Sequence, residues 1–300
     1  MRYIFILLFA GLLHSCTAQQ KQSKAVVSNL PVNADDNTLL WEISGNGIDT
    51  PSHLFGTFHL MCREDIHFSE NLKTAIKNSD EVYFEMDLDD PANTLGAMFY
   101  MNMKDGKKLK DLYTEAEYKR IITFFEDSMQ LPSMLLQRMK PTFLEAFLYP
   151  AMMPCKTMSG VEEELMKIAK ADKKEIKGFE TIAFQASVFD SIPYDVQAKS
   201  LLKTIDSLPL YRLNFDTMLN VYKSQQLGKI EKLFNGSDLT QEENLDVMLY
   251  NRNKNWVSQL KTILKKENIF MAVGAGHLVG SQGLIELLRK EGYTVRPIKN

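Results

Sequence analysis

The chain has 300 residues, of which 45% are hydrophobic, and a formal net charge of −3 at pH 7. These values suit a globular body and provide no basic patch, so we expect no nucleic-acid partner. A chain of this length can form one domain or a core that carries a large insertion, and the order of its predicted elements favours the insertion.

The first residues read as a signal peptide. Residues 3–13 are mostly apolar and follow a single positive charge, and a stretch of this length is too short to span a bilayer. Residues 13–16, Leu-His-Ser-Cys, resemble a bacterial lipobox, which predicts a signal peptide of residues 1–15 and a diacylglyceryl group on Cys16. The alternative is an ordinary signal peptide that is cleaved after Ala18.

A polar tether is predicted next. Residues 16–37 contain too little apolar area to order themselves, so we expect a lipid-anchored flexible linker ahead of a domain at 38–300. No second hydrophobic stretch approaches the length of a membrane span. The chain is therefore expected in the cell envelope, periplasmic or at the surface, with its N-terminal lipid as the membrane contact.

The domain is predicted to open with three strands, at 39–43, 53–58 and 81–86. An Asn-Gly pair in the turn over 45–47 indicates a hairpin between the first two strands. A helix over 69–78, with a serine as its N-cap, leads to the third strand.

The rest of the domain is mainly helical. From residue 92 to about 264 the apolar residues recur at helical spacing, interrupted by a short strand at 175–179. Strand 269–273, helix 282–289 and strand 293–297 then repeat the strand–helix–strand order of the opening. We therefore predict an α/β (α+β) fold, with a mixed β-sheet core built from two related half-units and a large helical insertion at roughly 92–264.

One short motif occurs twice. Residues 56–59 and 274–277 both read glycine, two residues, histidine, and each closes a run of strand-forming residues. Ligands bind at the carboxyl ends of strands in open α/β sheets, and a glycine lets the backbone approach a ligand without a Cβ in the way. His59 and His277 are thus predicted to face one crevice. A lone histidine near a strand end is more often structural, but two independent structural histidines have no reason to share this motif.

An acidic residue lies in the third predicted strand. Glu85 stands within an apolar run, where a carboxylate is costly to bury unless it is paired or bound to metal. If this strand lies beside the His59 strand, Glu85 reaches the same crevice, and two imidazoles with one carboxylate are a familiar ligand set for a catalytic divalent metal. Asp87, by the two-residue period of a strand, is a candidate second ligand or base. The alternatives for Glu85 are an exposed edge carboxylate and a partner for a lysine.

Two cysteines remain when Cys16 carries a lipid. A disulfide between Cys62 and Cys155 suits a compartment in which thiols oxidise, and it requires Cα atoms within roughly 7 Å of each other. The alternative is that Cys62, which follows His59 by three residues, lines the site as a free thiol.

Six segments of the chain carry a resemblance. They are residues 41–43, 54–59, 82–87, 178–181 with Gln185, 252–253 and 273–280. Together they resemble the TraB/GumN family (TraB/PrgY/GumN) of the Tiki-like superfamily, and the likeness covers nearly all of residues 39–298. By the same resemblance, Glu162 and Glu180 are expected to bind across the helical cap or to line the cleft.

The resemblance implies a metal-dependent site formed by His59, His277 and Glu85. Manganese or cobalt is implicated in the superfamily, and zinc is a further candidate. Arg252 matches a family position and is expected to hold a carboxylate or a substrate carbonyl, with an ordinary solvated helix arginine as the alternative.

The hypothesis from the sequence is a lipid-anchored envelope metal-dependent hydrolase that acts as a metallopeptidase on a peptide or protein substrate. Glu85 or Asp87 would serve as the base and Arg252 as electrostatic support. The alternatives are a non-catalytic peptide- or metal-binding protein of the envelope and a hydrolase of a non-peptide small molecule.

Overall fold

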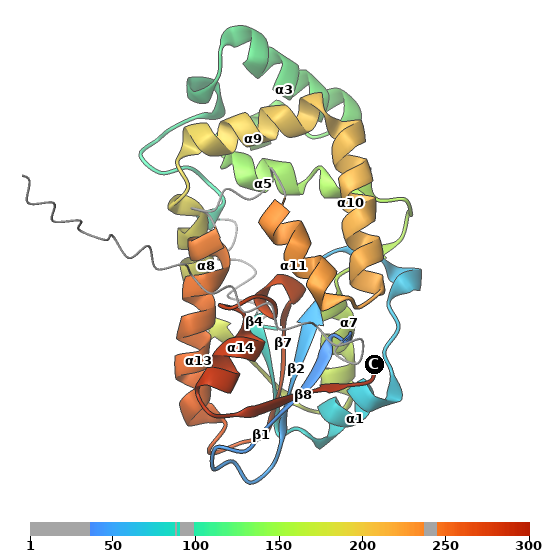
Figure 1. Ribbon diagram of the computed structural model, residues 1–300. Helices are drawn as coiled ribbons and strands as arrows, with labels where there is room; N and C mark the ends of the chain where they lie inside the picture. The colour runs from blue at the N-terminus through green and yellow to red at the C-terminus, as the bar shows by residue number, and fades with distance from the viewer. Residues whose placement is uncertain (1–36, 88, 91–98, 237–244) are drawn as a thin grey trace, which may run out of the picture. The chain divides into compact units, whose positions relative to one another are not determined.

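The computed structural model describes residues 37–87, 89–90, 99–236 and 245–300. Within them a six-stranded sheet has the strand order β6-β4-β7-β2-β1-β8 (Figure 1). Its strands are β1 (Leu40–Ser44), β2 (Ser52–Thr57), β4 (Glu81–Met86), β6 (Glu175–Glu180), β7 (Ile269–Gly274) and β8 (Thr294–Ile298). The predicted signal peptide, Cys16 and all but the last residue of the tether lie outside the described residues.

The sheet is mixed. Strands β6, β4, β7 and β2 run parallel, whereas β1 pairs antiparallel with both β2 and β8. The central strand β7 is buried from Ile269 to Val273, as its continuous apolar run predicts for a parallel strand covered on both faces. The turn between β1 and β2 places Gly45, Asn46 and Gly47 at positive φ, which suits glycine and asparagine.

Strand β7 of the second half-unit is inserted between two strands of the first. This corrects the premise that the Glu85 strand lies beside the His59 strand. Strand β4 does not lie beside β2, because β7 pairs with both and separates them. The most apolar strand takes the central place, where both of its faces are buried. Since β2, β7 and β4 are parallel, their carboxyl ends still share one edge of the sheet. The predicted fold class, a mixed sheet from two related half-units with a large helical insertion, is confirmed.

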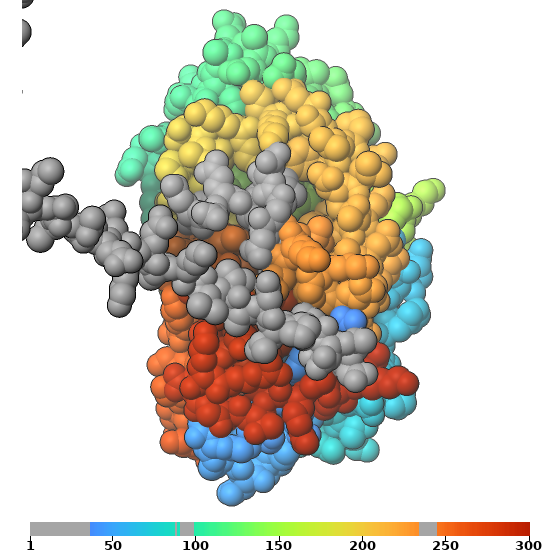
Figure 2. All heavy atoms as spheres, viewed as in Figure 1, coloured from blue at the N-terminus to red at the C-terminus, as the bar shows by residue number. Residues whose placement is uncertain are grey.

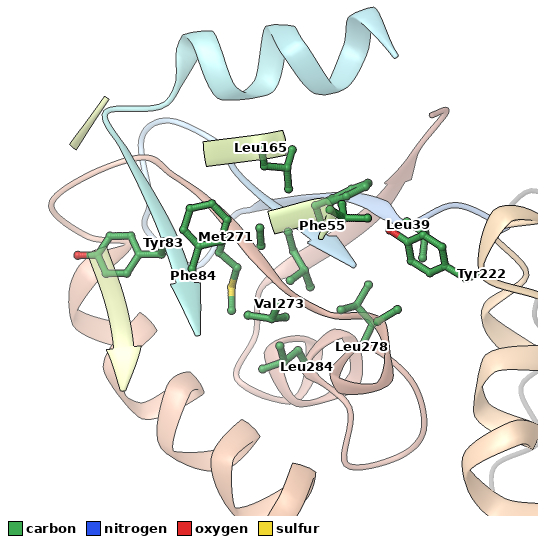
Figure 3. Close-up of a cluster of buried hydrophobic side chains, with 14 of the residues drawn as sticks. Leu39, Phe55, Tyr83, Phe84, Leu165, Tyr222, Met271, Val273, Leu278 and Leu284 are labelled. Atoms are coloured by element: carbon green, nitrogen blue, oxygen red, sulfur yellow. The ribbon is translucent and has the colours of Figure 1, made fainter. Parts of the chain in front are cut away.

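Helices cover both faces of the sheet. These are α1 (Glu70–Asn78), α7 (Val161–Ala171), α13 (Asn251–Ile263) and α14 (Leu284–Lys290). Helix α1 begins as predicted, because the Ser69 hydroxyl accepts a hydrogen bond from the Leu72 amide at 3.1 Å. In Figure 3, Leu165 of α7 lies on one side of the strands, and Leu278 and Leu284 lie on the other. All three side chains are buried.

The remaining helices form a cap. They are α3 (Glu115–Met129), α4 (Ser133–Leu136), α5 (Pro141–Ala146), α6 (Tyr149–Met152), α8 (Ile182–Asp190), α9 (Tyr194–Asp206), α10 (Leu208–Lys223) and α11 (Leu227–Gly236), with the short turn η3 (Leu109–Leu112). Of the other short turns, η2 (Arg63–Asp65) follows β3, the π-helical η4 (Asp246–Tyr250) leads into α13, and η5 (Ala275–His277) follows β7. The atoms of α9 and α10, yellow to orange, form a contiguous surface in Figure 2. Among the helices that the structure describes, none combines the length and the hydropathy that a bilayer span requires.

The cap is tied to the first G-x-x-H motif. From α10, the Tyr222 hydroxyl donates a hydrogen bond to the Gly56 carbonyl at 3.0 Å, and its ring lies 5.2 Å from that of Phe58. Both contacts are to residues of the strand end that carries His59. The cap therefore fixes the backbone of that motif.

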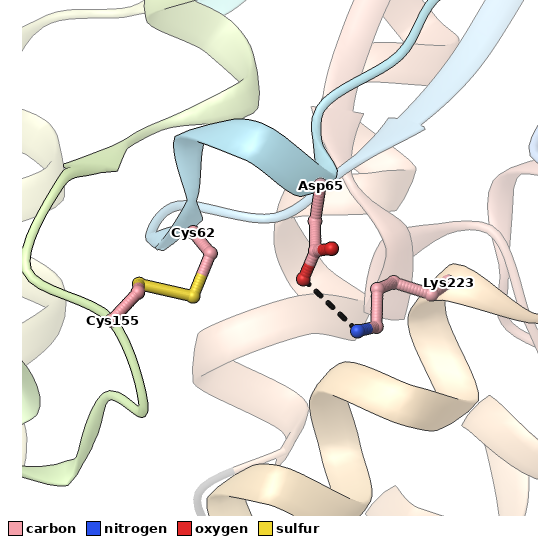
Figure 4. The surroundings of a disulfide bond; sticks show 4 residues. All are labelled: Cys62, Asp65, Cys155 and Lys223. Carbon is pink, nitrogen blue, oxygen red and sulfur yellow. Dashed lines mark hydrogen bonds and ion pairs between the residues drawn. A yellow bond between two sulfur atoms is a disulfide. The ribbon is translucent and has the colours of Figure 1, made fainter.

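Cys62 and Cys155 form a disulfide, with Cα atoms 5.8 Å apart (Figure 4). The bond lies beside a two-stranded sheet, in which β3 (Met61–Cys62) pairs with β5 (Met158–Ser159). Cys62 is thus not a free thiol. The disulfide fastens the segment just after His59 to the segment that leads into α7.

Candidate functional site

Three of the predicted residues converge on Gly274. A Cβ atom added to this glycine would lie 3.3 Å from Oε1 of Glu85, 3.7 Å from Cδ2 of His277 and 3.8 Å from Nε2 of His59. The parallel strands β4, β7 and β2 deliver these side chains to one edge of the sheet. A Cβ here would crowd the Glu85 carboxylate, whereas its distances to the two histidine rings are ordinary van der Waals contacts.

Glu85 projects from β4 into this convergence. Its Oε1 accepts a hydrogen bond from the Gly274 amide at 2.9 Å, and its Oε2 accepts from Nη2 of Arg252 at 2.6 Å and from the Gln185 amide at 3.3 Å. Burial acts to raise the pKa of Glu85, but the attraction of His277 and Arg252 outweighs it and lowers the pKa to about 2. Glu85 is therefore ionised at neutral pH.

Arg252, in α13, forms the centre of a buried polar network. Its Nε donates to Oε1 of Glu180 at 3.0 Å and its Nη2 donates to Oε2 of Glu180 at 2.8 Å. Its Nη1 donates to the Met248 carbonyl at 3.0 Å and lies 3.3 Å from Nε2 of His277. The side chain is 8% exposed, so it is not the solvated helix arginine of the alternative interpretation.

Glu180 is the main partner of this arginine. Its side chain is 1% exposed, and the Trp256 indole donates to Oε1 at 2.8 Å while the Gln185 amide donates to Oε2 at 3.1 Å. Burying a carboxylate is tolerable here because every oxygen has a donor and a full positive charge lies beside it.

His277 is buried and held by its neighbours in α13. Its Nδ1 lies 2.6 Å from Oδ1 of Asn253, whose amide nitrogen donates to the Gln282 carbonyl at 2.8 Å. Since Asn253 directs its oxygen at the ring, Nδ1 carries the proton and Nε2 carries the lone pair. Burial lowers the pKa of His277 to about 3. The ring also packs on Trp256, with centroids 4.5 Å apart.

His59 is held in a different way. Its Nδ1 lies 2.7 Å from Oε1 of Glu162, which also accepts a hydrogen bond from the Thr57 hydroxyl at 2.6 Å. The attraction of Glu162 raises the pKa of His59 to about 9. The histidine side chain is 74% exposed, so solvent screens what this pair contributes to stability. The two histidines thus differ in protonation at neutral pH.

Asp87 lies outside this arrangement of strands. Strand β4 ends at Met86, so the two-residue alternation on which the Asp87 prediction depended stops one residue before it. Its carboxylate accepts a hydrogen bond from the Asp89 amide at 3.3 Å, and burial together with the Asp89 carboxyl raises its pKa. This hydrogen bond is to the loop that follows β4.

A pocket of about 390 Å³ opens beside the convergence. Its lining residues are His59, Phe84, Glu85, Met86, Gly160, Glu162, Glu163, Met166 and Gln185. The strand ends of the first half-unit and the start of α7 therefore share one concave surface. Such a pocket, with a few convergent polar groups, is the usual form of a small-ligand or active site.

The donor types around Gly274 fit a divalent metal. Each histidine has Nδ1 held by an oxygen, which is the outer contact that orients a metal-binding imidazole and directs its Nε2 at the ion. Glu85 supplies an ionised carboxylate. Across residues 37–87, 89–90, 99–236 and 245–300, however, no three His, Cys, Asp or Glu side chains form a ready-made metal-binding group. Arg252 contacts both Glu85 and His277.

Sequence reasoning missed Asn253 and Trp256 as supporting residues. Both lie in α13 within four residues of Arg252, where their side chains hold His277 and Glu180. The signal that points to them is a set of large polar and aromatic residues within a single turn of an otherwise amphipathic helix. Thr57, which holds Glu162, is the second residue of the first G-x-x-H motif and gave no separate signal.

These features define a class of protein, in which parallel strands bring two histidines and a buried carboxylate together at one edge of the sheet. Of the three, His59 and Glu85 line the pocket, whereas His277 is buried behind it. The sequence profile of the TraB/PrgY/gumN family matches residues 39–297. The chain belongs to this family, and the resemblance drawn from the six segments is confirmed.

Several relatives carry the name metalloprotease. The chain is 25% identical to Metalloprotease TIKI1 of Danio rerio, in an alignment that covers 87% of this chain and 63% of the relative. The TIKI1 proteins of Xenopus tropicalis and Homo sapiens are each 23% identical, with 94% and 88% of this chain and 63% of each relative covered. The chain thus spans less than two thirds of these relatives. No solved structure matches the chain.

Proposed function

We propose that this chain is a metal-dependent hydrolase that acts as a peptidase, with a divalent ion held by His59, Glu85 and His277. The observation that carries the proposal is the convergence of these three side chains within 4 Å of a Cβ position at Gly274. Membership of a family with relatives named metalloprotease supports it.

The states of His277 and Glu85 suit metal ligands, whereas His59 must lose a proton before it can bind an ion. His277 is neutral, with its Nε2 lone pair facing Glu85, and Glu85 is ionised. Two imidazoles and a carboxylate suit zinc, manganese or cobalt. When bound, such an ion polarises a carbonyl and lowers the pKa of a bound water, which makes it a nucleophile at neutral pH.

The other residues hold these groups and receive the substrate. Glu162 and Asn253 orient the two imidazoles through their Nδ1 atoms. Phe84, Met86 and Met166 give the pocket an apolar wall against which a substrate side chain can pack. With a pKa of about 2, Glu85 suits a ligand better than a general base, and we assign no catalytic role to Asp87.

The proposal is tested by peptide cleavage. The purified protein, loaded in turn with manganese, cobalt and zinc, is incubated with a broad peptide library, and the products are identified by mass spectrometry. We expect cleavage that is lost in His59→Ala and His277→Ala and kept in the exposed control His67→Ala. If metal binds and every peptide is returned intact, the peptidase assignment is wrong.

The same experiment separates the rival functions. Arg252 donates a hydrogen bond to Oε2 of Glu85 and contacts Nε2 of His277. Because these are atoms that would bind the metal, the contacts favour a binding protein that captures a peptide without cleaving it. Such a protein would retain peptides on the immobilised chain and release them unchanged. A hydrolase of non-peptide esters would instead cleave a chromogenic ester in the same metal-dependent way, with no effect on peptides.

We also propose that the chain is a lipoprotein of the cell envelope. The sequence of residues 1–16 motivates this, with Cys16 as the modified residue. Cys16→Ala should abolish labelling by a radioactive or clickable fatty acid and release the protein from the membrane fraction. An intact mass that begins at Gln19 without lipid would show that an ordinary signal peptide is removed instead.

A further inference from the structure

We propose that Arg252 and a divalent metal compete for the same ligands, so that the ion binds only when the guanidinium withdraws from Glu85 and His277. This inference rests on the proposed function for the place of the ion. It assigns to Arg252 a positioning role, in which a resident positive charge holds the ligands together and sets the affinity of the site.

The contacts of the guanidinium show the overlap. Nη2 of Arg252 donates to Oε2 of Glu85 at 2.6 Å, and Nη1 lies 3.3 Å from Nε2 of His277. That Nε2 atom carries the only lone pair of the ring, because Nδ1 is committed to Asn253. A guanidinium and a metal ion are both positive and both need this lone pair. They cannot use it together.

Glu180 and the Met248 carbonyl can keep Arg252 paired when the guanidinium turns away from Glu85 and His277. Its Nε and Nη2 are bound by Glu180, and its Nη1 is bound by the Met248 carbonyl. Nη2 also donates to Glu85 and Nη1 also contacts His277, but Nε donates to both oxygens of Glu180, so the arginine keeps this carboxylate as a partner when it turns away from the two ligands. Met248 belongs to the π-helical turn η4, and such turns are concentrated at functional sites.

Gln185 lies between the two carboxylates that bind Arg252, Glu85 and Glu180. Its amide nitrogen lies 3.3 Å from Oε2 of Glu85 and 3.1 Å from Oε2 of Glu180, and its side chain also lines the pocket. When the guanidinium leaves Glu85, Gln185 remains within reach of that carboxylate. A hydrogen bond to Glu85 is thereby kept without a second positive charge near the ion.

Neutralising the arginine should therefore tighten metal binding. Arg252→Met alone would leave Glu180 as a buried, unpaired charge, which is strongly destabilising, so it is combined with Glu180→Gln, whose amide oxygen can still accept from the Trp256 indole. We expect the double variant to bind Mn²⁺ or Zn²⁺ about tenfold more tightly than the wild type, the effect of one charge-assisted hydrogen bond.

Two further variants sharpen the test. Arg252→Lys keeps a positive partner for Glu180 but lacks the planar fork that reaches both ligands, so it too should bind metal more tightly. Glu180→Gln alone removes the negative charge that competes with Glu85 for the guanidinium, so this variant should bind metal more weakly. The control is Arg120→Met with Asp206→Asn, which neutralises an exposed ion pair of the cap and should leave the affinity unchanged.

Affinities are measured by calorimetric titration of the full chain with Mn²⁺ and Zn²⁺, after circular dichroism has shown that each variant is folded. Tighter binding by Arg252→Lys and by the double variant supports the competition. Equal or weaker binding by both, with the wild type binding normally, overturns it and makes Arg252 a support of the site. If the wild type and all variants fail to bind either metal, the proposed function itself is wrong.

Discussion

Nδ1 of His59 lies 2.7 Å from Oε1 of Glu162, a residue 103 positions further along the chain. The pair forms because the backbone of residues 58–59 lies directly against that of residues 160–161. The Val161 amide donates to the Phe58 carbonyl at 3.1 Å, and a Cβ on Gly160 would come within 2.8 Å of the His59 carbonyl. Only glycine allows this approach, which gives the segment ahead of α7 a direct part in positioning the first histidine.

This pair predicts how metal binding depends on pH. Because Glu162 raises the pKa of His59 to about 9, His59 is protonated at pH 7, and an ion must displace that proton. His277, whose pKa is about 3, releases none. Metal affinity should therefore rise between pH 7 and 9, with up to about one proton released per ion, as measured by calorimetry in buffers of different ionisation enthalpy.

Glu162→Gln provides the check on that prediction. It removes the charge that raises the pKa of His59, so the rise in affinity should move to lower pH, towards the ordinary histidine value of about 6.5. Glu64→Gln, at an exposed position, is the control and should behave as the wild type. A pH dependence that is the same in Glu162→Gln and in the wild type would contradict the account of His59.

Stability should fall in mild acid. The pKa of His277 is lowered to about 3, so below pH 6.5 the unfolded chain gains a proton that the folded chain does not. The free energy of unfolding then drops by up to about 1.4 kcal/mol per pH unit from this group. Glu85, with a folded pKa of about 2, adds a further loss below about pH 4.5. Its stabilising contribution is present only at higher pH.

Urea unfolding between pH 4.5 and 7.5 measures this effect. His277→Gln should be less stable than the wild type at pH 7, since it loses the contact with Asn253, and its stability should depend less on pH across this range. His67→Gln, an exposed control, should follow the wild type. An equal slope in His277→Gln and the wild type would mean that another group titrates.

Removing Glu180 should be severely destabilising. Glu180→Ala leaves Arg252 buried with only the Glu85 carboxylate as a counter-charge and cuts the hydrogen bond to Trp256. Breaking a buried ion pair from one side costs about 3–5 kcal/mol. Chemical unfolding measures the loss, and Asp206→Ala, which breaks an exposed pair, should cost less than about 1 kcal/mol. Similar losses in the two variants would argue against a central role for the Arg252 network.

The disulfide should stabilise the body of the protein. Replacing Cys62 and Cys155 by serine releases a link across 93 positions of sequence and should lower the free energy of unfolding by about 2–4 kcal/mol. Cys16→Ser, outside the described residues, is the control and should leave unfolding of the folded body unchanged. Unaltered stability of the double variant would show that the pairing of β3 with β5 is sufficient without the bond.

The sequence predicted where strands and helices lie along the chain better than it predicted which strands pair with each other. The alternation of apolar residues and the Ser69 cap located β1, β2, α1 and β4, and the apolar run 269–273 located the buried strand β7. The insertion of β7 between β2 and β4 could not be predicted, since strand order depends on pairing between residues about 200 positions apart. Periodicity along a single strand does not report which strand lies beside it.

The site was predicted only in part, because contacts between segments far apart in sequence cannot be read from periodicity. The repeated motif and an acidic residue in an apolar strand identified His59, His277 and Glu85, which the structure brings together. Asp87 was placed by extending β4 beyond its end at Met86. Arg252 was named, but its full engagement by Glu180, Met248 and Glu85 arises only when α13 packs against the strand ends.

The central claim is that two motifs far apart in sequence hold one metal ion. The measurement that tests it is calorimetric titration of the wild type, His59→Ala, His277→Ala and the double variant with Mn²⁺ and Zn²⁺. Ligands of a single centre act as a unit, so either replacement should remove most of the binding, and the double variant should lose little more. Additive losses, or an unchanged stoichiometry in both single variants, would contradict the claim and show that the two G-x-x-H motifs are strand-end turns without a shared ion.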